Sequence, residues 1–174
     1  MGDVAGWPES VDFGTDAAVD DILSASAVCR ERGLPFCHSL VFGGEAETWE
    51  TVAETIAVMD ACRPTAVTAM CGVRVYPETP LAERLIARGE VPSVEALYEP
   101  YFSFAPAVRD GLVEVVAAAA RERGNWLLPG NKVNDEEELF ARLRGRGLKG
   151  DLWRYVSRLR LGRALAAGPA EARK

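Results

Sequence analysis

The sequence has a single histidine, only four cysteines and no excess of basic residues. Its formal net charge of −6 is unlike the basic footprint of a nucleic-acid-binding protein and mainly favours solubility. No apolar run approaches the ~20 residues that a membrane-spanning helix needs. The first residues, MGDVAGWPES, lack the basic start and the apolar core of a signal peptide. We therefore expect a cytoplasmic protein with neither nucleic-acid nor membrane partners.

The cysteines stand at positions 29, 37, 62 and 71, with wide and irregular gaps between them. No pair has the C-x-x-C spacing of a zinc or redox site, and no three have the close spacing of an iron–sulfur site. In a cytoplasm these thiols should stay reduced. We therefore expect four small apolar side chains in the interior rather than a metal site.

What the sequence does have is a regular alternation of extended and helical patterns over residues 10–89. The whole chain of 174 residues is long enough to form one compact domain with its own core. Apolar runs rich in strand formers alternate with segments whose apolar residues recur with a helical period. Thr79 can cap the last of these helices, with Pro80 at its first position. The expected strands are 10–13, 35–42 and 66–76, and the expected helices are 19–32, 48–62 and 81–89.

This alternation predicts an α/β fold with parallel strands and helices on the outside, because the strands lack strict polar alternation and are separated by helices. Such folds bind ligands at the carboxyl ends of their strands. Gly43 and Gly44 lie at such an end, where the backbone can approach a ligand closely. Glu45 and Glu47 fall at the start of the next helix, where the helix dipole favours acids.

The second part of the chain differs in kind. Residues 90–108 read as irregular, with several prolines and aromatic residues, and residues 125–130 read as a turn or a short extended segment. Helices are expected over 110–123, 134–147 and about 150–166. We therefore divide the chain into a partial (β/α) barrel over 1–108 and a C-terminal helical extension over 109–174 that packs on it.

Several segments resemble a known family. FGTDAA, FCHSLVFGGEAET and VRVYPETPLAERLIARGEV resemble the second half of a radical S-adenosylmethionine enzyme barrel, most of all in the group with an N-terminal cobalamin-binding domain. FAPAVRD, RGNWLLPG and GLKGDLW are similar to the C-terminal extension of that group. In this family a C-x-x-x-C-x-x-C motif holds a [4Fe–4S] cluster that reduces S-adenosylmethionine to a radical. With cobalamin, the outcome is often methylation of an unreactive carbon.

The resemblance implies a half parallel (β/α) barrel of about three βα units and assigns S-adenosylmethionine contacts to the matched positions. The family's fourth strand, whose end reaches the ribose, resembles Gly14–Asp16, and its fifth resembles Val41–Thr48, where the apolar residue touches adenine. Its sixth resembles Arg74–Pro77, with the backbone near adenine. The implied cofactor-binding residues are Thr15, Asp16, Val41, Gly43, Gly44, Glu47, Val75 and Tyr76.

The sequence also departs from the family. It has no C-x-x-x-C-x-x-C motif and no counterpart of the first three barrel strands. Glu45–Ala46 replaces the usual Pro-Gly, which removes the residue best able to take a positive φ and adds a negative charge at the mouth of the pocket. The resemblance therefore leaves S-adenosylmethionine as a possible ligand, whereas this chain alone should bind neither the [4Fe–4S] cluster nor cobalamin.

Three residues have a structural interpretation beside the functional one. His38 could contact substrate inside the barrel, or it could be a packed, hydrogen-bonded core histidine. Glu47 could contact the cofactor, hold its loop through backbone amides, or serve only as a helix-start carboxylate. Asp16 could bind a ribose hydroxyl or cap a helix. We assign no catalytic residue and no metal ligand.

Three parallel strands cannot close a barrel, so both outer strands would expose an edge. We expect a homodimer, or a separate chain that supplies the missing half-barrel. Two functions stay open. The chain is the S-adenosylmethionine- and substrate-pocket half of a split or truncated radical enzyme, not catalytic alone, or it is a non-catalytic binding or assembly protein or a degenerate remnant.

Overall fold

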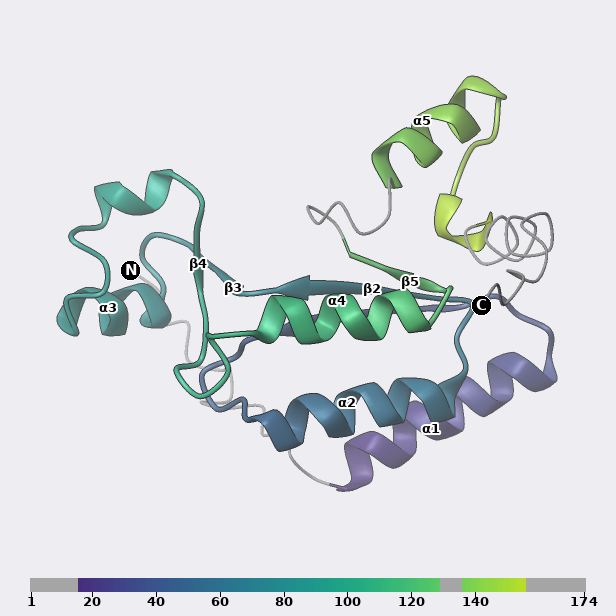
Figure 1. The fold of residues 1–174 in the computed structure, drawn as a ribbon, viewed down its shortest axis with the longest axis horizontal. Helices are drawn as coiled ribbons and strands as arrows, with labels where there is room; N and C mark the ends of the chain where they lie inside the picture. The colour runs from purple at the N-terminus through teal and green to yellow at the C-terminus, as the bar shows by residue number, and fades with distance from the viewer. Residues whose placement is uncertain (1–15, 129–135, 156–174) are drawn as a thin grey trace, which may run out of the picture.

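The centre of the fold is a parallel sheet of three strands in the order β1–β2–β5 (Figure 1). The structure, a computed structural model, describes residues 16–128 and 136–155. Strand β1 (Cys37–Phe42) pairs along its whole length with β2 (Ala66–Cys71), and β2 pairs with the short strand β5 (Trp126–Leu127). The predicted α/β class with parallel strands is therefore confirmed.

Helices α1 and α2 follow the predicted segments closely, because the sequence marks where they begin and end. Thr48 caps α2 by accepting a hydrogen bond from the Thr51 backbone N–H, and the Thr79 hydroxyl does the same for α3 with Pro80 in the first turn. The helices are α1 (Asp16–Glu31), α2 (Trp49–Cys62), α3 (Pro80–Ala87), α4 (Leu112–Glu122) and α5 (Glu136–Gly145), with 3-10 turns η1 (Glu95–Tyr98) and η2 (Leu152–Tyr155).

Two expected elements are only partly within the described residues. The strand expected at 10–13 lies outside them, so its pairing is not described. Of the helix expected at about 150–166, the described part contains only η2. No helix within residues 16–128 or 136–155 has both the length and the apolar character of a membrane span.

The strand expected over residues 66–76 is interrupted at Gly72, which corrects the sequence interpretation. β2 ends at Cys71, and β3 (Val73–Val75) pairs antiparallel with β4 (Tyr101–Ser103), in a segment that we expected to be irregular. Gly72 has φ of +88°, and a Cβ on it would lie 2.8 Å from the Phe104 ring. The glycine is therefore the point where the chain leaves the sheet and enters a separate two-stranded ribbon.

Of the two structures expected for residues 125–130, a turn or a short extended segment, the described part contains the second, as strand β5. Strand β5 pairs with β2 through Val67–Trp126 and Thr68–Leu127. Helix α4 lies directly before β5 and contributes Leu112 and Val116 to the same hydrophobic cluster as Phe42. One core therefore spans both sides of position 108, and the division of the chain at that position stays a prediction.

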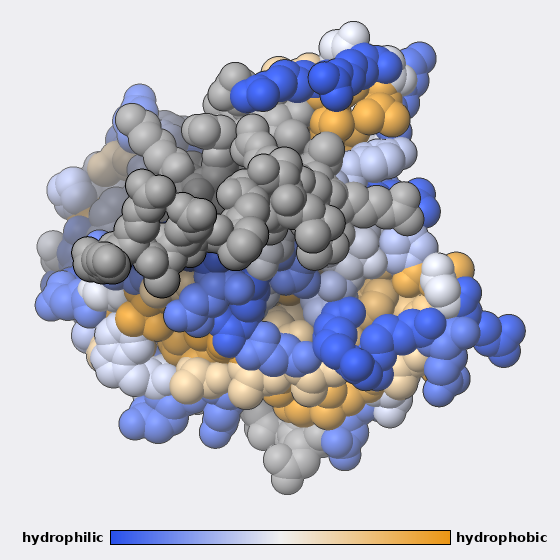
Figure 2. Space-filling view, turned by 45° about the vertical axis from the view of Figure 1, so that its right-hand side comes forward, coloured by the Kyte–Doolittle hydropathy of each residue, from blue (hydrophilic) through white to orange (hydrophobic). Residues whose placement is uncertain are grey.

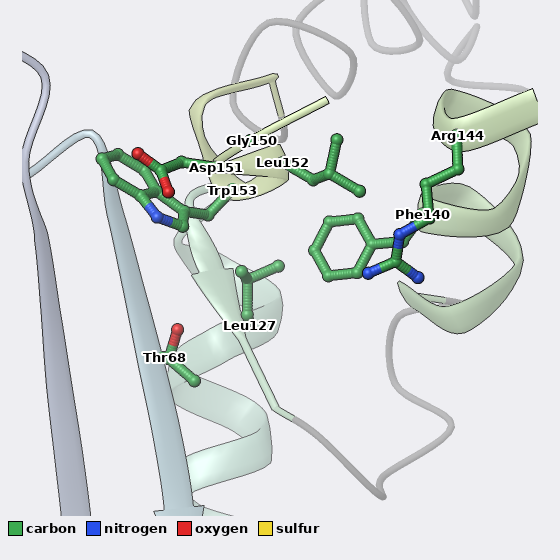
Figure 3. A pocket seen from close by; sticks show the side chains of 8 residues that line it. All are labelled: Thr68, Leu127, Phe140, Arg144, Gly150, Asp151, Leu152 and Trp153. Atoms are coloured by element: carbon green, nitrogen blue, oxygen red, sulfur yellow. The ribbon is translucent and has the colours of Figure 1, made fainter. Parts of the chain in front are cut away.

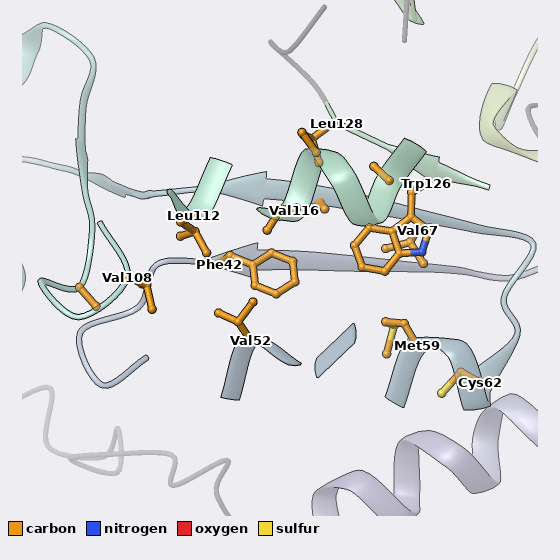
Figure 4. Packing of buried hydrophobic residues seen from close by; sticks show 14 residues of the cluster. Phe42, Val52, Met59, Cys62, Val67, Val108, Leu112, Val116, Trp126 and Leu128 are labelled. Atoms are coloured by element: carbon orange, nitrogen blue, oxygen red, sulfur yellow. The ribbon is translucent and has the colours of Figure 1, made fainter. Parts of the chain in front are cut away.

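The two faces of the sheet have different surroundings. Phe42, Val67 and Trp126 point to the face covered by α2 and α4, where they pack in the main core (Figure 4).

A second, smaller core joins α3 to the β3–β4 ribbon through five buried residues. They are Val75, Ala82, Leu85, Val91 and Leu97.

The opposite face, which we call the open face, carries Ser39, Val41, Thr68, Met70 and Leu127 because side chains alternate along a strand. Val41 and Met70 are 53% and 45% exposed. Helix α5 lies on this side, away from α1 and α2 (Figure 1). In Figure 2, hydrophobic side chains reach the surface in several places between hydrophilic ones.

Candidate functional site

The carboxyl end of β1 is a tightly packed turn around Gly43. This residue is buried and has φ of +101°, and a Cβ on it would lie 3.3 Å from both the Gly72 backbone nitrogen and the Phe104 ring. Its N–H donates to the Glu47 carboxylate, and its carbonyl accepts from the Ala105 N–H at 3.0 Å. The packing of the chain itself therefore requires glycine here, and both polar backbone groups of Gly43 are engaged within the protein.

Gly44 is different, because a Cβ on it would meet no heavy atom within 4 Å. Its carbonyl accepts from the Glu47 N–H at 2.9 Å, which closes a tight turn. The half-exposed side chain of Val41 comes from the strand just before it. Of the predicted glycine pair, Gly44 is thus the residue with open space beside it, where a ligand can approach the backbone.

Glu47 holds this loop. Its carboxylate accepts the Gly43 N–H, and its own N–H completes the turn onto Gly44. Of the three roles considered for Glu47 from the sequence, this contact corresponds to fixing the loop through a backbone amide.

The change from Pro-Gly to Glu45–Ala46 has less effect than the sequence suggests. Among the described non-glycine residues only Arg63 and Glu78 have positive φ, so Ala46 does not need the conformation that glycine would supply. The Glu45 carboxylate pairs with Arg84 and with Arg88, the latter at 2.9 Å. The hydrogen bond from Arg84 is the main cause that lowers the pKa of Glu45. Arg84 of α3 and Arg88 at the C-cap of that helix thus balance the negative charge expected at the pocket mouth.

Further ion pairs continue along this edge of the molecule. Arg88 reaches Glu90 at 3.5 Å, and Arg109 reaches Glu90 at 3.2 Å. These pairs connect the β1–α2 loop, α3 and the segment that leads into α4. Because the side chains are 30% to 52% exposed, each of these pairs adds little stability by itself.

The β3–β4 ribbon holds the next predicted contacts. Val75 is fully buried in the smaller core, whereas Tyr76 is 59% exposed. Arg74 lies between the Tyr76 and Phe102 rings, with its guanidinium carbon 5.3 Å and 5.7 Å from their centroids, and its buried Nε has no hydrogen-bond partner. Phe102 was not predicted as a neighbour of this site, because β4 is only three residues long and carries no clear strand pattern.

His38 lies on the other face of the sheet from Val41. Its Nε2 is 3.1 Å from the Ser26 hydroxyl of α1, and its ring meets Phe36 edge-on at 5.5 Å. Burial lowers the pKa of His38, which favours the neutral imidazole. The side chain therefore faces the helix layer and not the open face where Thr68 and Leu127 lie.

Thr15 lies outside the described residues, and Asp16 is the first residue of α1. The structure therefore brings Val41, Gly43, Gly44 and Glu47 together at one rim. Val75 and Tyr76 follow in the ribbon that leaves the sheet through Gly72, and His38 stays apart.

The cysteines do not gather. Cys29 lies in α1, Cys62 ends α2, and Cys37 and Cys71 lie in β1 and β2. No group of three His, Cys, Asp or Glu side chains within the described ranges could hold a metal ion. Burial, and then the charges of Glu47 and Glu114, raise the pKa of Cys71 to about 11. These thiols therefore do not fit a [4Fe–4S] cluster, which needs thiolates from neighbouring positions.

A pocket of about 280 Å³ lies on the open face, between the sheet and the C-terminal segments (Figure 3). Thr68 and Leu127 of the sheet line it together with residues of α5 and of the segment around η2. This pocket could not be predicted from the sequence, because its lining comes from segments that are far apart in the chain.

Comparison with known proteins extends this picture. No family model matches the chain, and no curated protein matches its sequence. Among solved structures it matches the radical S-adenosylmethionine methyltransferase TsrM from Kitasatospora setae, solved with cobalamin and a [4Fe–4S] cluster bound, with a TM-score of 0.63.

The fold resembles part of a radical S-adenosylmethionine methyltransferase. The identity to TsrM is 22%, and the match covers 94% of this chain but 37% of TsrM. The chain thus spans little more than a third of that enzyme. At this identity the match establishes a shared fold, and the expected resemblance is supported at that level.

Proposed function

We propose that this chain forms the S-adenosylmethionine- and substrate-facing half of a parallel (β/α) barrel of the radical S-adenosylmethionine type and is not catalytic alone. The observation that carries the proposal is the parallel sheet with Gly43 and Gly44 at its carboxyl rim, within a fold that matches part of TsrM. Parallel βα units bind ligands at this end of their strands.

At the rim, open space beside Gly44 and the exposed side chains of Val41 and Tyr76 suit the flat apolar face of adenine. Gly43 and Glu47 shape the loop, and the backbone of Val75 and Tyr76 is the other proposed contact with adenine. Thr15 and Asp16 are the proposed ribose contacts. S-adenosylmethionine supplies an adenosyl and a methyl group when it is bound. The residues of this chain would bind and orient it, and cysteines from outside this sequence would have to hold any cluster.

The partner is part of the proposal. Val41 and Met70 are about half exposed on a face that a complete barrel would enclose. A second copy of this chain, or a polypeptide with the remaining strands and a cysteine triad, would cover that face. The reading frame just upstream of this sequence is the first place to look for the triad.

A second function is favoured by one observation. The backbone of Gly43 is bonded within the protein, and Glu45 is tied to Arg84 and Arg88 across the mouth. A rim that satisfies its own polar groups suits a protein that keeps the scaffold for binding or assembly and no longer uses S-adenosylmethionine.

Calorimetry with S-adenosylmethionine separates the two functions. We expect saturable heat with the full chain and its loss in Gly44→Leu, because the new side chain fills the open space beside the rim. Gly145→Leu is the matched control, since Gly145 also has open space around it, lacks a positive φ and lies in α5. No heat at millimolar ligand would favour the non-catalytic function.

A further inference from the structure

The pocket on the open face has a floor made by the sheet. Thr68 of β2 and Leu127 of β5 are paired in register, and both side chains point away from α2 and α4. Thr68 lies three residues before the end of β2, which corresponds to about 10 Å along the strand. The pocket is therefore a separate site from the rim around Gly44.

Its walls come from the C-terminal segments. Phe140 and Arg144 are four residues apart in α5, so one face of the helix presents both of them. Gly150, Asp151, Leu152 and Trp153 form the facing wall. At about 280 Å³ the pocket lies just below the ≈300–1,000 Å³ typical of sites for drug-sized ligands, so it suits a smaller molecule.

The lining has an uneven distribution of polarity. Four large apolar side chains, Leu127, Phe140, Leu152 and Trp153, surround the space. Figure 3 shows Arg144 and Phe140 on the α5 side of the pocket, and Asp151 and Trp153 on the opposite side. One end of the pocket is thus cationic and the other anionic, with apolar surface between them.

We propose that this pocket binds a small organic acid with a compact apolar body and one carboxylate. The carboxylate pairs with Arg144, because a guanidinium offers two parallel N–H donors that match a carboxylate. The apolar body lies between Leu127, Leu152 and Trp153. Asp151 repels a carboxylate, so the ligand binds with its carboxylate at the Arg144 end of the pocket. This site requires no S-adenosylmethionine at the rim and goes beyond the proposed function.

A series of three probes with the same ring tests the proposal. Benzoate, benzamide and benzylamine carry a negative, a neutral and a positive group, and titration of the full chain followed by backbone amide NMR locates and ranks their binding. We expect benzoate to bind at least ~5-fold more tightly than benzamide, with benzylamine weakest. The shifted amides should be those of Thr68, Leu127 and residues 150–153.

Variants show which side chain is responsible. Arg144→Gln should reduce the affinity for benzoate to that for benzamide, whereas Arg121→Gln, an exposed arginine in α4, should leave it unchanged. Asp151→Asn should keep or raise benzoate affinity, and Leu127→Ala should weaken all three probes. Gly44→Leu should bind benzoate as the parent chain does, so failure at the rim and failure at the pocket remain distinguishable.

Any of four results would overturn the proposal. The first is tightest binding of benzylamine, which would make Asp151 the recognising group. The others are equal affinities for all three probes, shifts at amides away from the pocket, and no saturation at tens of millimolar benzoate.

Discussion

At the scale of single residues, the rim depends on two glycines that lie against one ring. A Cβ on Gly72 would come 2.8 Å from Phe104, and a Cβ on Gly43 would come 3.3 Å from the same ring. Both residues also have a positive φ, which other residues adopt at a cost of roughly 1–2 kcal/mol. Glycine is therefore required at both positions for two reasons, the lack of space for a Cβ and the backbone conformation.

Gly72→Ala should therefore lower the free energy of unfolding by about 2–4 kcal/mol, because backbone strain and the clash with Phe104 add. Urea unfolding followed by circular dichroism measures this change. Gly145→Ala is the matched control, since its Cβ meets nothing within 4 Å and its φ is not positive, and it should be neutral or slightly stabilising. Equal stability of the two variants would show that Gly72 does not have this geometry.

At the scale of elements, the ion pairs of Glu45 attach α3 to the β1–α2 loop. The pKa of Glu45 lies below the ordinary value of 4.5, chiefly because of its hydrogen bond to Arg84. A carboxylate with a lowered pKa stabilises the folded protein at pH values above 4.5, and this contribution disappears as the pH falls further. The pairs are exposed, so the effect is a modest one.

Glu45→Gln should cost less than about 1 kcal/mol of stability at pH 7, and the difference from the parent chain should shrink as the pH falls from 5 to 3. Salt at 1 M should also reduce the difference at pH 7, because it screens exposed charges. Thermal unfolding across this pH range measures both. Glu54→Gln, an exposed carboxylate of α2, serves as the control. A difference that is independent of pH and salt would argue against the ion pairs.

The sequence predicts the longer elements well and the short ones poorly. Helix α3 is recognisable because Thr79 caps it with Pro80 in its first turn, and α2 because its apolar residues repeat with the helical period. Strands β4 and β5 have three and two residues, which is too short to show a period. Their pairing depends on distant residues, as does the break at Gly72, which follows from the position of Phe104.

The candidate site, like the fold, could be predicted from the sequence only in part. The rim could be located from the sequence, because Gly43–Gly44 directly follow an apolar strand. The hydrogen bonds that occupy Gly43, the pairing of Glu45 with α3 and the helix-facing side of His38 all depend on tertiary contacts. The pocket at Thr68 combines three distant segments, and no local pattern marks it.

At the scale of the whole molecule, the open face sets the expectation for assembly. Val41 and Met70 are exposed on it, and exposed large apolar side chains on a sheet favour association. Size-exclusion chromatography with light scattering at micromolar concentration should show a dimer. Val41→Lys combined with Met70→Lys should shift it to monomer, whereas Ser39→Lys on the same face replaces no apolar side chain and should have a smaller effect.

Far-UV circular dichroism should be the same for the parent chain and these variants, which separates loss of association from loss of folding. A parent chain that elutes as a monomer would rule out the homodimer and leave a separate chain as the proposed partner.

The placement of Phe104 has a mechanical consequence. The ring packs against the large core and lies beside both Gly43, at the end of β1, and Gly72, where the ribbon begins. Two backbone hydrogen bonds hold the same junction, from the Gly72 N–H to the Phe42 carbonyl at 2.7 Å and from the Ala105 N–H to the Gly43 carbonyl at 3.0 Å. A change of the Phe104 side chain would therefore reach the turn at the end of β1 and the start of the ribbon at once.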